Sequence, residues 1–380
     1  MTRPVTQGLG LNVVCPYYTM FPLAFPAELL RRAAPGDWVL DPFCGRGTTL
    51  FAAREAGLPC VGVDSSPVAV AIAEAKLCSA TSAQVAAECE RILTSGKGLR
   101  ELPQGEFWTL AYHPDTLREL CTLREDLLED CSTDVRKLLR ALILGRLHGP
   151  LRRGLPSYLS NQMPRTFAPK PAYSVRFWRA RGLLPPRVDV LDLVRRTAGR
   201  YFDRLPAAVS GQVRLGDARR TDFASLGGPY AWVITSPPYY GMRTYVPDQW
   251  LRNWFLGGPA DVAYEFEGQL SHRSPEQFVE DLATVWRSVA AASRSGARLV
   301  VRFGGIRDRK ASPRDLLVAS LRASGSWQLE TVVPTAPASR AGRQASQFRL
   351  PGLAEPVEEA DYHAQLTGPG PFGGSGGAFA

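Results

Sequence analysis

"PGDWVLDPFCGRGTTLFAAREAGLPCVGVDSSPVAVAIAEAKL", residues 35–77, reads as strand, glycine turn, helix, strand and helix. The first strand ends at Asp41, and the helix after the glycine turn stops at Gly57, which suits a left-handed cap. The second strand ends at Asp64, and Ser66 with the proline after it then begins another helix. This alternation predicts an α/β fold with a Rossmann-like, doubly wound sheet, helices on both faces and a ligand site at the carboxyl ends of the strands.

The alternation resumes in the second half of the chain. "GQVRLGD" at 211–217 and "YAWVITS" at 230–236 read as buried strands, and "ARLVVRF" and "SWQLETVVP" read as later ones. Ser274 and Ser312 are each followed by proline, so both are expected to begin helices. We expect a sheet of at least six strands.

Between these halves lies a segment without strand patterns. Apolar residues recur at helical spacing near 114–130, 133–148 and 188–205. The leucines that define the first two patterns are Leu117, Leu120, Leu127, Leu138, Leu142 and Leu147. The predicted organisation is a first part of the sheet domain at 1–80, a mainly helical insertion at 81–210, a second part at 211–350 and a disordered acidic and glycine-rich tail at 351–380.

Composition favours a globular protein with a polyanionic partner. The 380 residues are 45% hydrophobic and 21% charged, with a formal charge of +9 carried mostly by arginine, which pairs well with phosphates and guanine edges. No apolar run is long enough to span a membrane and the start has no signal segment, so we expect a cytoplasmic protein. The seven cysteines form no close pair, and no metal site is expected.

The glycine turn "DPFCGRGTT" admits three interpretations. A nucleotide P-loop needs a lysine before the Ser/Thr, and only Arg46 stands nearby, so this interpretation fails. A dinucleotide fingerprint needs a third glycine where Leu50 stands, which weakens that interpretation. The third is S-adenosylmethionine, with Asp41 facing the charged methionine part and Asp64 binding the ribose hydroxyls.

"TSPPYY" at 235–240 decides between them, because it supplies chemistry for an exocyclic amine. Such an amine is a poor nucleophile until acceptors draw its protons out of the ring plane. Prolines cannot donate and hold the carbonyls beside them as outward acceptors, so Ser236 and the carbonyl of Pro237 can bind the amine. With Pro238 holding the turn, Tyr239 can stack on a base that has left the helix.

These motifs resemble motifs I, II and IV of the DNA amino-methyltransferases, and "FPAELL" at 25–30 resembles their motif X. The resemblance covers about residues 17–80 and 211–255. It implies catalytic roles for Ser236, Pro237, Pro238 and Tyr239, and cofactor contacts from Phe25, Asp41, Phe43, Gly45, Gly47, Thr48, Asp64, Ser66 and Asp217. Within that family SPPY is typical of N4-cytosine methylation, so N4-cytosine is the expected target, with N6-adenine as the alternative.

The order of the motifs departs from part of that family. Members with motifs X and I paired at one end usually place motif IV before motif I, whereas here it follows, so the chain looks circularly permuted relative to them. The resemblance implies double-stranded DNA as partner and is compatible with a cognate restriction endonuclease and a homodimer. RNA as substrate, or an inactive DNA-binding subunit, are weaker alternatives.

Target recognition is expected in the basic and aromatic part of the insertion. The candidate DNA-binding residues, which combine phosphate contacts with side chains suited to base edges, are Arg152, Arg153, Tyr158, Asn161, Gln162, Arg165, Lys170, Arg176, Arg179 and Arg181, with Arg243 next to the SPPY motif. The alternative is a helical cap that merely covers the sheet.

Overall fold

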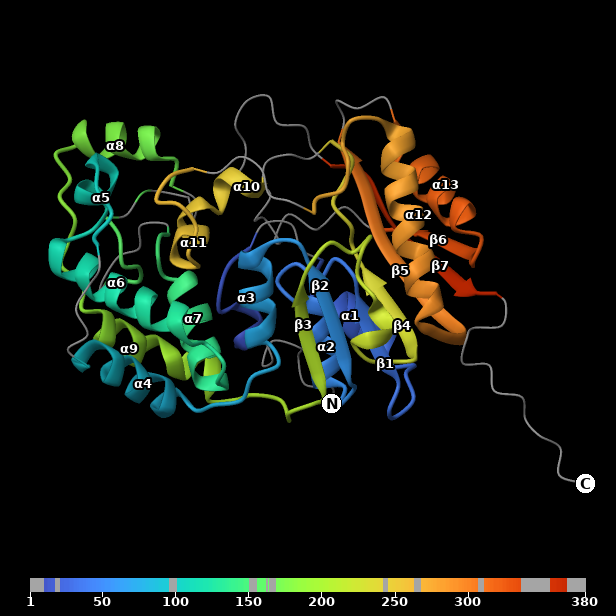
Figure 1. Cartoon of the computed structure of the whole chain (residues 1–380), viewed down its shortest axis with the longest axis horizontal. Helices are drawn as coiled ribbons and strands as arrows, with labels where there is room; N and C mark the ends of the chain where they lie inside the picture. Colours follow the sequence, from blue (N-terminus) through green and yellow to red (C-terminus); the bar gives the residue numbers. More distant parts are fainter. Residues whose placement is uncertain are drawn as a thin grey trace, which may run out of the picture. The chain divides into compact units, whose positions relative to one another are not determined.

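The computed structural model describes residues 10–17, 21–95, 101–149, 156–161, 163, 169–241, 245–262, 268–306, 311–335 and 356–367. The chain forms two compact units (Figure 1). The sheet unit comprises 19–73, 207–243 and 266–380, and the helical unit comprises 1–18, 74–206 and 244–265.

The sheet unit is built on seven strands in the order β3-β2-β1-β4-β5-β7-β6. All pairs from β3 to β5 are parallel, and β7 is antiparallel to both β5 and β6. The strands are β1 (Trp38–Asp41), β2 (Cys60–Asp64), β3 (Gly211–Leu215), β4 (Tyr230–Thr235), β5 (Ser293–Ile306), β6 (Trp327–Pro334) and β7 (Pro356–Leu366). The predicted Rossmann-like α/β fold is confirmed.

Helices cover both faces of this sheet (Figure 1). On one face Val61 and Val63 join a core cluster that includes the fully buried Trp286. Gly62 points the other way, where an added Cβ would lie 2.7 Å from Leu50 Cδ1. The helices are α1 (Ala24–Leu30), α2 (Thr48–Glu55), α3 (Pro67–Ala75), α12 (Pro275–Ala291) and α13 (Pro313–Ser324), with a 3-10 turn, η3 (Phe223–Ser225).

Three helices of the sheet unit begin as their Ser-Pro pairs predict. The hydroxyls of Ser66, Ser274 and Ser312 each accept the N–H three residues further on, at 3.2–3.3 Å. The proline after each serine occupies a position whose N–H would have no helical partner. Gly57 has φ of +71°, as expected for the residue that ends α2.

Part of the segment predicted as a disordered tail is a strand, so that prediction is wrong for 356–366. β7 inserts between β5 and β6, and its Tyr362, Ala364 and Leu366 are buried in the core. Charged and polar residues alternate with these three, which makes the segment acidic overall while leaving one apolar face. The alternation of apolar and polar residues indicated a strand, but the acidic average composition of the segment favoured a prediction of disorder.

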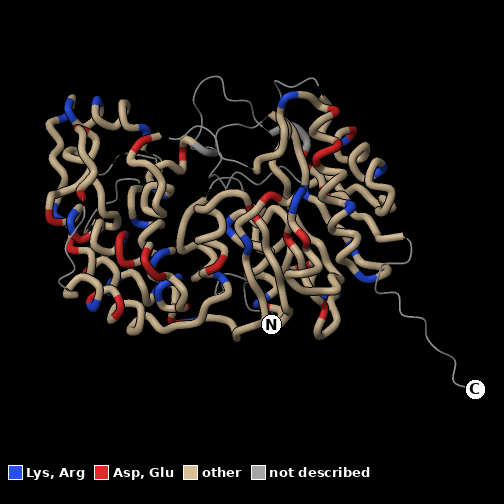
Figure 2. The backbone as a smooth tube through the Cα atoms, viewed as in Figure 1, with Lys and Arg blue, Asp and Glu red and all other residues tan. Residues whose placement is uncertain are grey.

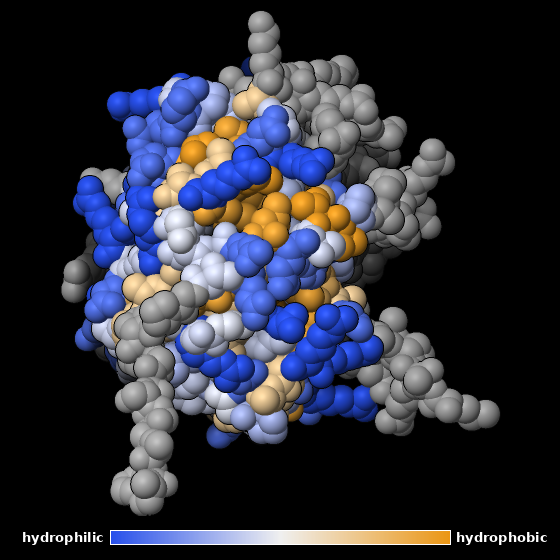
Figure 3. Space-filling model, turned by 90° about the vertical axis from the view of Figure 1, so that its right-hand side faces the viewer, coloured by the Kyte–Doolittle hydropathy of each residue, from blue (hydrophilic) through white to orange (hydrophobic). Residues whose placement is uncertain are grey.

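The far edge of the sheet carries features that discourage pairing with another sheet. β6 is the edge strand, and its register with β7 shifts between Leu329 and Thr331. On the side of the molecule seen in Figure 3, hydrophobic patches are separated by hydrophilic residues. Val333 is 45% exposed on β6, whereas the exposed Glu330 adds a charge to the same strand. A register shift and a charge are common protections of an edge strand.

The helical unit confirms the predicted helices of the insertion. The six leucines that defined the first two patterns are all buried. Its helices are η2 (Leu11–Val13), α4 (Ser82–Thr94), α5 (Glu106–Ala111), α6 (Pro114–Glu129), α7 (Asp134–Leu144), α8 (Pro171–Arg179), α9 (Val190–Phe202), α10 (Tyr245–Asp248) and α11 (Trp250–Phe255). No helix among the described residues is long and apolar enough to cross a membrane.

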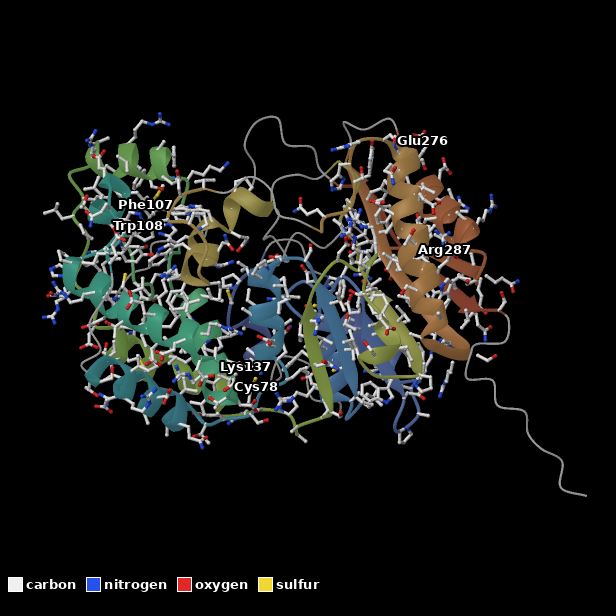
Figure 4. All side chains as sticks on the ribbon, viewed as in Figure 1. Cys78, Phe107, Trp108, Lys137, Glu276 and Arg287 are labelled. Atoms are coloured by element: carbon white, nitrogen blue, oxygen red, sulfur yellow. The ribbon has the colours of Figure 1, made fainter. Side chains whose placement is uncertain are left out.

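Aromatic packing corrects the predicted placement of 250–255 in the second part of the sheet domain, 211–350. Trp250 and Trp254 of α11 contact Trp108 of α5, with ring centroids 5.8 and 4.5 Å apart. Phe107 lies 5.0 Å from Trp250, and both labelled α5 side chains point into the interior of the helical unit (Figure 4). Residues 244–265 therefore belong to the helical unit, although they follow the SPPY motif in sequence.

Candidate functional site

The glycine turn after β1 has space for a ligand beside its backbone. Gly45 has φ of +50° and Gly47 has φ of +78°, a region that favours glycine. A Cβ added at Gly45 would meet no atom within 4 Å, so a ligand has room to approach the main chain there. Gly47 is the N-cap of α2, and the buried Thr48 is the first residue of that helix. This backbone fits a cofactor that contacts the turn closely.

Asp41, at the end of β1, is almost fully buried. Its Oδ1 accepts the N–H of Phe43 at 3.2 Å and the hydroxyl of Thr235 at 2.6 Å. Burial raises the pKa of Asp41 to about 6, although hydrogen bonds from Thr235 and the Phe43 backbone lower it. A carboxyl of this kind is costly to keep ionised and gains from a cationic partner.

Asp64, at the end of β2, faces the same turn. Its Oδ2 accepts the N–H of Gly45 at 2.8 Å, and its Oδ1 accepts the N–H of Ser66 at 2.9 Å. Burial raises the pKa of Asp64, and the two backbone hydrogen bonds oppose this effect. Each carboxylate oxygen has a further lone pair, so Asp64 can still accept hydroxyl groups from a ligand.

Two hydrogen bonds join the glycine turn to the strand that precedes the SPPY motif. Thr235 Oγ1 donates to Asp41, and Thr49 Oγ1 donates to the carbonyl of Ile234 at 3.2 Å. β1 and β4 are neighbouring parallel strands whose connections run to opposite sides of the sheet. Their carboxyl ends therefore lie at the switch point where doubly wound sheets bind ligands. The sequence had predicted this shared rim but neither threonine contact.

The SPPY residues begin directly at that rim. Ser236 and Pro238 are partly buried, and Pro237 is buried. The ring of Tyr239 packs edge-on against Phe303 of β5, with centroids 5.4 Å apart. Its hydroxyl donates to Glu359 Oε1 of β7. Neither Phe303 nor Glu359 was singled out from the sequence.

The two phenylalanines predicted to contact a cofactor have well-defined neighbours. The guanidinium of Arg302 lies 3.8 Å from the ring centre of Phe25 and is held by two hydrogen bonds to Asp361, at 2.6 and 2.8 Å. Phe43 contacts Trp286 edge-on, with centroids 6.3 Å apart. Arg302 and Asp361 are buried, and their pairing fixes the position of the cation over Phe25.

Asp217, which follows β3, forms an ion pair with Arg219. Arg219 Nε lies 2.9 Å from Asp217 Oδ1, and Nη2 lies 2.7 Å from Oδ2. Burial would raise the pKa of Asp217, but these hydrogen bonds lower it overall. A Cβ added at Gly268 would lie 3.3 Å from the Cβ atoms of both Asp217 and Ser65. Gly268 thus closes over this corner of the site, a contact that sequence reasoning missed.

Cys44, inside the glycine turn, has a packing role. An added Cβ at Gly62 would lie 3.0 Å from its sulfur, and burial raises the pKa of the Cys44 thiol. A buried thiol of this kind is a poor nucleophile. The seven cysteines, all of them among the described residues, form no disulfide, and the described residues contain no cluster of three or more His, Cys, Asp or Glu able to hold a metal ion.

The candidate DNA-binding residues separate into three groups. Arg152, Arg153, Gln162, Arg165 and Arg243 lie outside the described residues. Lys170, Arg176, Arg179 and Arg181 are exposed on and beside α8. Asn161 and Tyr158 are buried, and the prediction that they contact DNA is wrong.

The buried pair instead stabilises the helical unit. The Asn161 side-chain amide donates to the carbonyls of Leu110 and Leu183, at 3.0 and 3.2 Å. The guanidinium of Arg146 lies 5.6 Å from the ring centre of Tyr158. The polar groups of Asn161 and Tyr158 suggested contacts with DNA bases, but in the structure both side chains anchor the segment that precedes α8.

Residues 7–75 match the family model described as DNA methylase, of the N6/N4 class. A curated relative, the type II methyltransferase M.MjaII of Methanocaldococcus jannaschii, is 47% identical over 49 residues, which are 13% of this chain and 9% of that protein. The matched segment thus spans about a tenth of the relative's length. Both matches support a relation to the DNA amino-methyltransferases, and the family model covers the glycine turn and its two flanking strands.

Two solved structures with partial likeness are methyltransferases. An rRNA methyltransferase, aviRa, from Streptomyces viridochromogenes is 13% identical with a TM-score of 0.36, covering 95% of this chain and 93% of that one. An S-adenosylmethionine-dependent methyltransferase from Methanosarcina mazei is 8% identical with a TM-score of 0.35, covering 91% and 98%. At TM-scores this low the likeness carries no functional inference.

Proposed function

We propose that this protein transfers a methyl group from S-adenosylmethionine to the exocyclic N4 amine of cytosine in double-stranded DNA. The observation that carries the proposal is the hydrogen bond from Thr235 to Asp41 at 2.6 Å. It ties the residue before Ser236 to the carboxylate beside the glycine turn. The amine-binding motif and the cofactor turn therefore share one rim, as a transfer between two bound molecules requires.

The residues at the rim fit S-adenosylmethionine. Asp41 offers a buried carboxylate for the cofactor's ammonium group, and Asp64 offers acceptors for ribose hydroxyls. The space beside the backbone of Gly45 admits close approach. Phe25, whose ring Arg302 contacts, is assigned to the cofactor by the family resemblance. When bound, the cofactor supplies a methyl group on a positively charged sulfur. Ser66 and Asp217 would lie nearer its adenine.

The SPPY motif would prepare the amine. Ser236 Oγ and the carbonyl of Pro237 accept its two protons in hydrogen bonds, which makes the nitrogen lone pair available. Tyr239 stacks on the face of the flipped base and holds the amine toward the cofactor turn. No described carboxylate or histidine is needed as a base, because the proton can leave to solvent after transfer.

The choice of cytosine rests on the serine of the motif. SPPY favours cytosine N4 through the family resemblance, whereas the acceptor chemistry alone would also serve adenine N6. Adenine is therefore the second candidate, and RNA or an inactive DNA-binding subunit are the remaining ones. The family model, which covers both N6 and N4 enzymes, is compatible with either base.

For DNA contact we propose the exposed face of α8. Arg176 and Arg179 lie on this helix, Lys170 precedes it and Arg181 follows it. In Figure 2, which has the view of Figure 1, basic positions are coloured blue along the tube of α8. Arg181 stacks on Phe177, with 4.1 Å from its guanidinium to the ring centre, and Tyr173 is 56% exposed. Exposed arginines beside an aromatic ring suit phosphates and bases.

Ser236→Ala tests the catalytic part of the proposal. It removes the acceptor side chain but leaves Asp41 and the glycine turn intact, so methyl transfer should fall about a hundredfold while cofactor affinity stays unchanged. Single-turnover methyl transfer and calorimetric titration with S-adenosylmethionine measure the two quantities. Undiminished transfer would show that Ser236 has no catalytic role.

A further inference from the structure

Tyr239 is linked to a strand far along the chain. Its hydroxyl donates to Glu359 Oε1 at 2.5 Å, across a separation of 120 residues. The ring also packs against Phe303, with an interplanar angle of 80°. The position of this ring is therefore restricted in three ways. Two prolines precede Tyr239 in the chain, the ring packs against Phe303, and its hydroxyl is hydrogen-bonded to Glu359.

Glu359 is itself held by the sheet. Its carbonyl accepts the backbone N–H of Thr335 at 2.9 Å and the Thr335 hydroxyl at 2.7 Å. The next residue, Ala360, pairs with Phe303 of β5 on one side and Pro334 of β6 on the other. The carboxylate thus projects from a strand with a neighbour on each side, and Phe303, the ring contact of Tyr239, belongs to the adjacent strand.

We propose that Glu359 is a positioning residue that fixes the ring of Tyr239 for stacking on the target base. The inference rests on the proposed function, since it assigns a partner to a residue of that site. A phenol ring attached to its backbone can rotate about its side-chain bonds, and a hydrogen bond at the far end removes that freedom. A ring fixed in advance costs less entropy when the base arrives.

Four variants test this role. Glu359→Ala removes the acceptor, Glu359→Gln keeps an oxygen that can accept the hydroxyl, and Tyr239→Phe removes the donor. The double variant Tyr239→Phe with Glu359→Ala completes the cycle. Glu330→Ala, which removes an exposed carboxylate on β6, is the matched control. Thermal unfolding and S-adenosylmethionine titration establish that each variant is folded and binds cofactor.

Single-turnover methyl transfer to DNA gives the expected pattern. Glu359→Ala should slow transfer about tenfold with unchanged cofactor affinity, and Glu359→Gln should recover most of the rate. In the Tyr239→Phe background Glu359→Ala should cause no further loss, because the contact is already absent. An equal loss in both backgrounds, or no loss from Glu359→Ala, would overturn the proposal.

A spectroscopic measurement tests the contact without relying on activity. In protein labelled with 3-fluorotyrosine, the Tyr239 fluorine resonance is assigned by its loss in Tyr239→Phe. It should shift in Glu359→Ala and stay in place in Glu330→Ala. A resonance unmoved by Glu359→Ala overturns the inference, whereas a shift in a protein that methylates no nucleic acid would reject the proposed function and retain the contact.

Discussion

Asp41 is subject to two opposing effects. A cationic ligand binds best to the ionised carboxylate, whereas burial favours the neutral carboxylic acid. Burial raises the pKa of Asp41 to about 6 from the ordinary value of 3.8 for an aspartate side chain. Between pH 3.8 and about 6, Asp41 is therefore mostly protonated in the folded protein and mostly ionised in the unfolded chain. The stability contributed by the raised pKa is present at low pH and is lost as pH rises toward 6.

Asp41→Asn should therefore stabilise the cofactor-free protein at pH 8 by about 2 kcal/mol, because it removes a buried charge while keeping an oxygen for Thr235 and Phe43. The same change should weaken S-adenosylmethionine binding at least tenfold. Urea unfolding and calorimetric titration measure the two effects. Glu101→Gln, at an exposed carboxyl, is the control, and a destabilised Asp41→Asn at pH 8 would contradict the account.

Thr235→Val should shift the pH dependence of cofactor binding. Binding of an ammonium group is expected to strengthen as Asp41 ionises, with a midpoint near pH 6 in the unaltered protein. The Thr235 hydrogen bond lowers the pKa of Asp41, so its removal should move the midpoint upward by about one pH unit. Titrations from pH 5 to 8 measure this, and superimposable profiles would contradict the assigned role of Thr235.

Secondary-structure elements differ in how clearly the sequence reveals them. β1, β2, α2 and α3 were predictable because apolar runs, glycines and, for α3, a Ser-Pro pair agree locally. β7 was not, since its charged residues dominate a composition-based view. α11 was placed in the wrong unit, because its packing on Trp108 joins segments far apart in sequence. The contact from Tyr239 to Glu359 was missed for the same reason.

The β7 assignment can be tested at Ala364, which is 3% exposed and pairs with Leu299 and Leu329. Ala364→Asp would place a carboxylate in the core and should cost about 3 kcal/mol of unfolding free energy or more. Gln328→Asp, on the exposed edge strand, should change stability by only about 0.5 kcal/mol. Equal denaturant midpoints for Ala364→Asp and the unaltered protein would indicate that the segment is not a strand.

The α8 surface gives a prediction of its own. Arg176→Ala with Arg181→Ala should weaken DNA binding and reduce the slope of log affinity against log salt by about 1 to 2, since each phosphate contact releases counterions. Arg287→Ala, on the outer side of α12 (Figure 4), is the matched control. Fluorescence anisotropy at several salt concentrations measures the slopes. If the double variant and the control have the same slope, DNA does not contact α8.

On the scale of the whole molecule, the chain passes repeatedly between a sheet unit and a helical unit. The sheet unit carries the glycine turn, both aspartates and the SPPY motif, whereas α8 with its arginines belongs to the helical unit. A net charge of +9 is consistent with a nucleic acid as partner. The division places the proposed chemistry in one unit and the proposed DNA contacts in the other.

The most direct test of the central claim is the identity of the methylated nucleoside. Purified protein is incubated with methyl-labelled S-adenosylmethionine and unmethylated bacterial genomic DNA, which is then digested and analysed by mass spectrometry. The account predicts label in N4-methyl-2′-deoxycytidine. Label in N6-methyl-2′-deoxyadenosine would retain the mechanism and reject the cytosine assignment, whereas DNA without label, alongside confirmed cofactor binding, would contradict DNA amino-methylation.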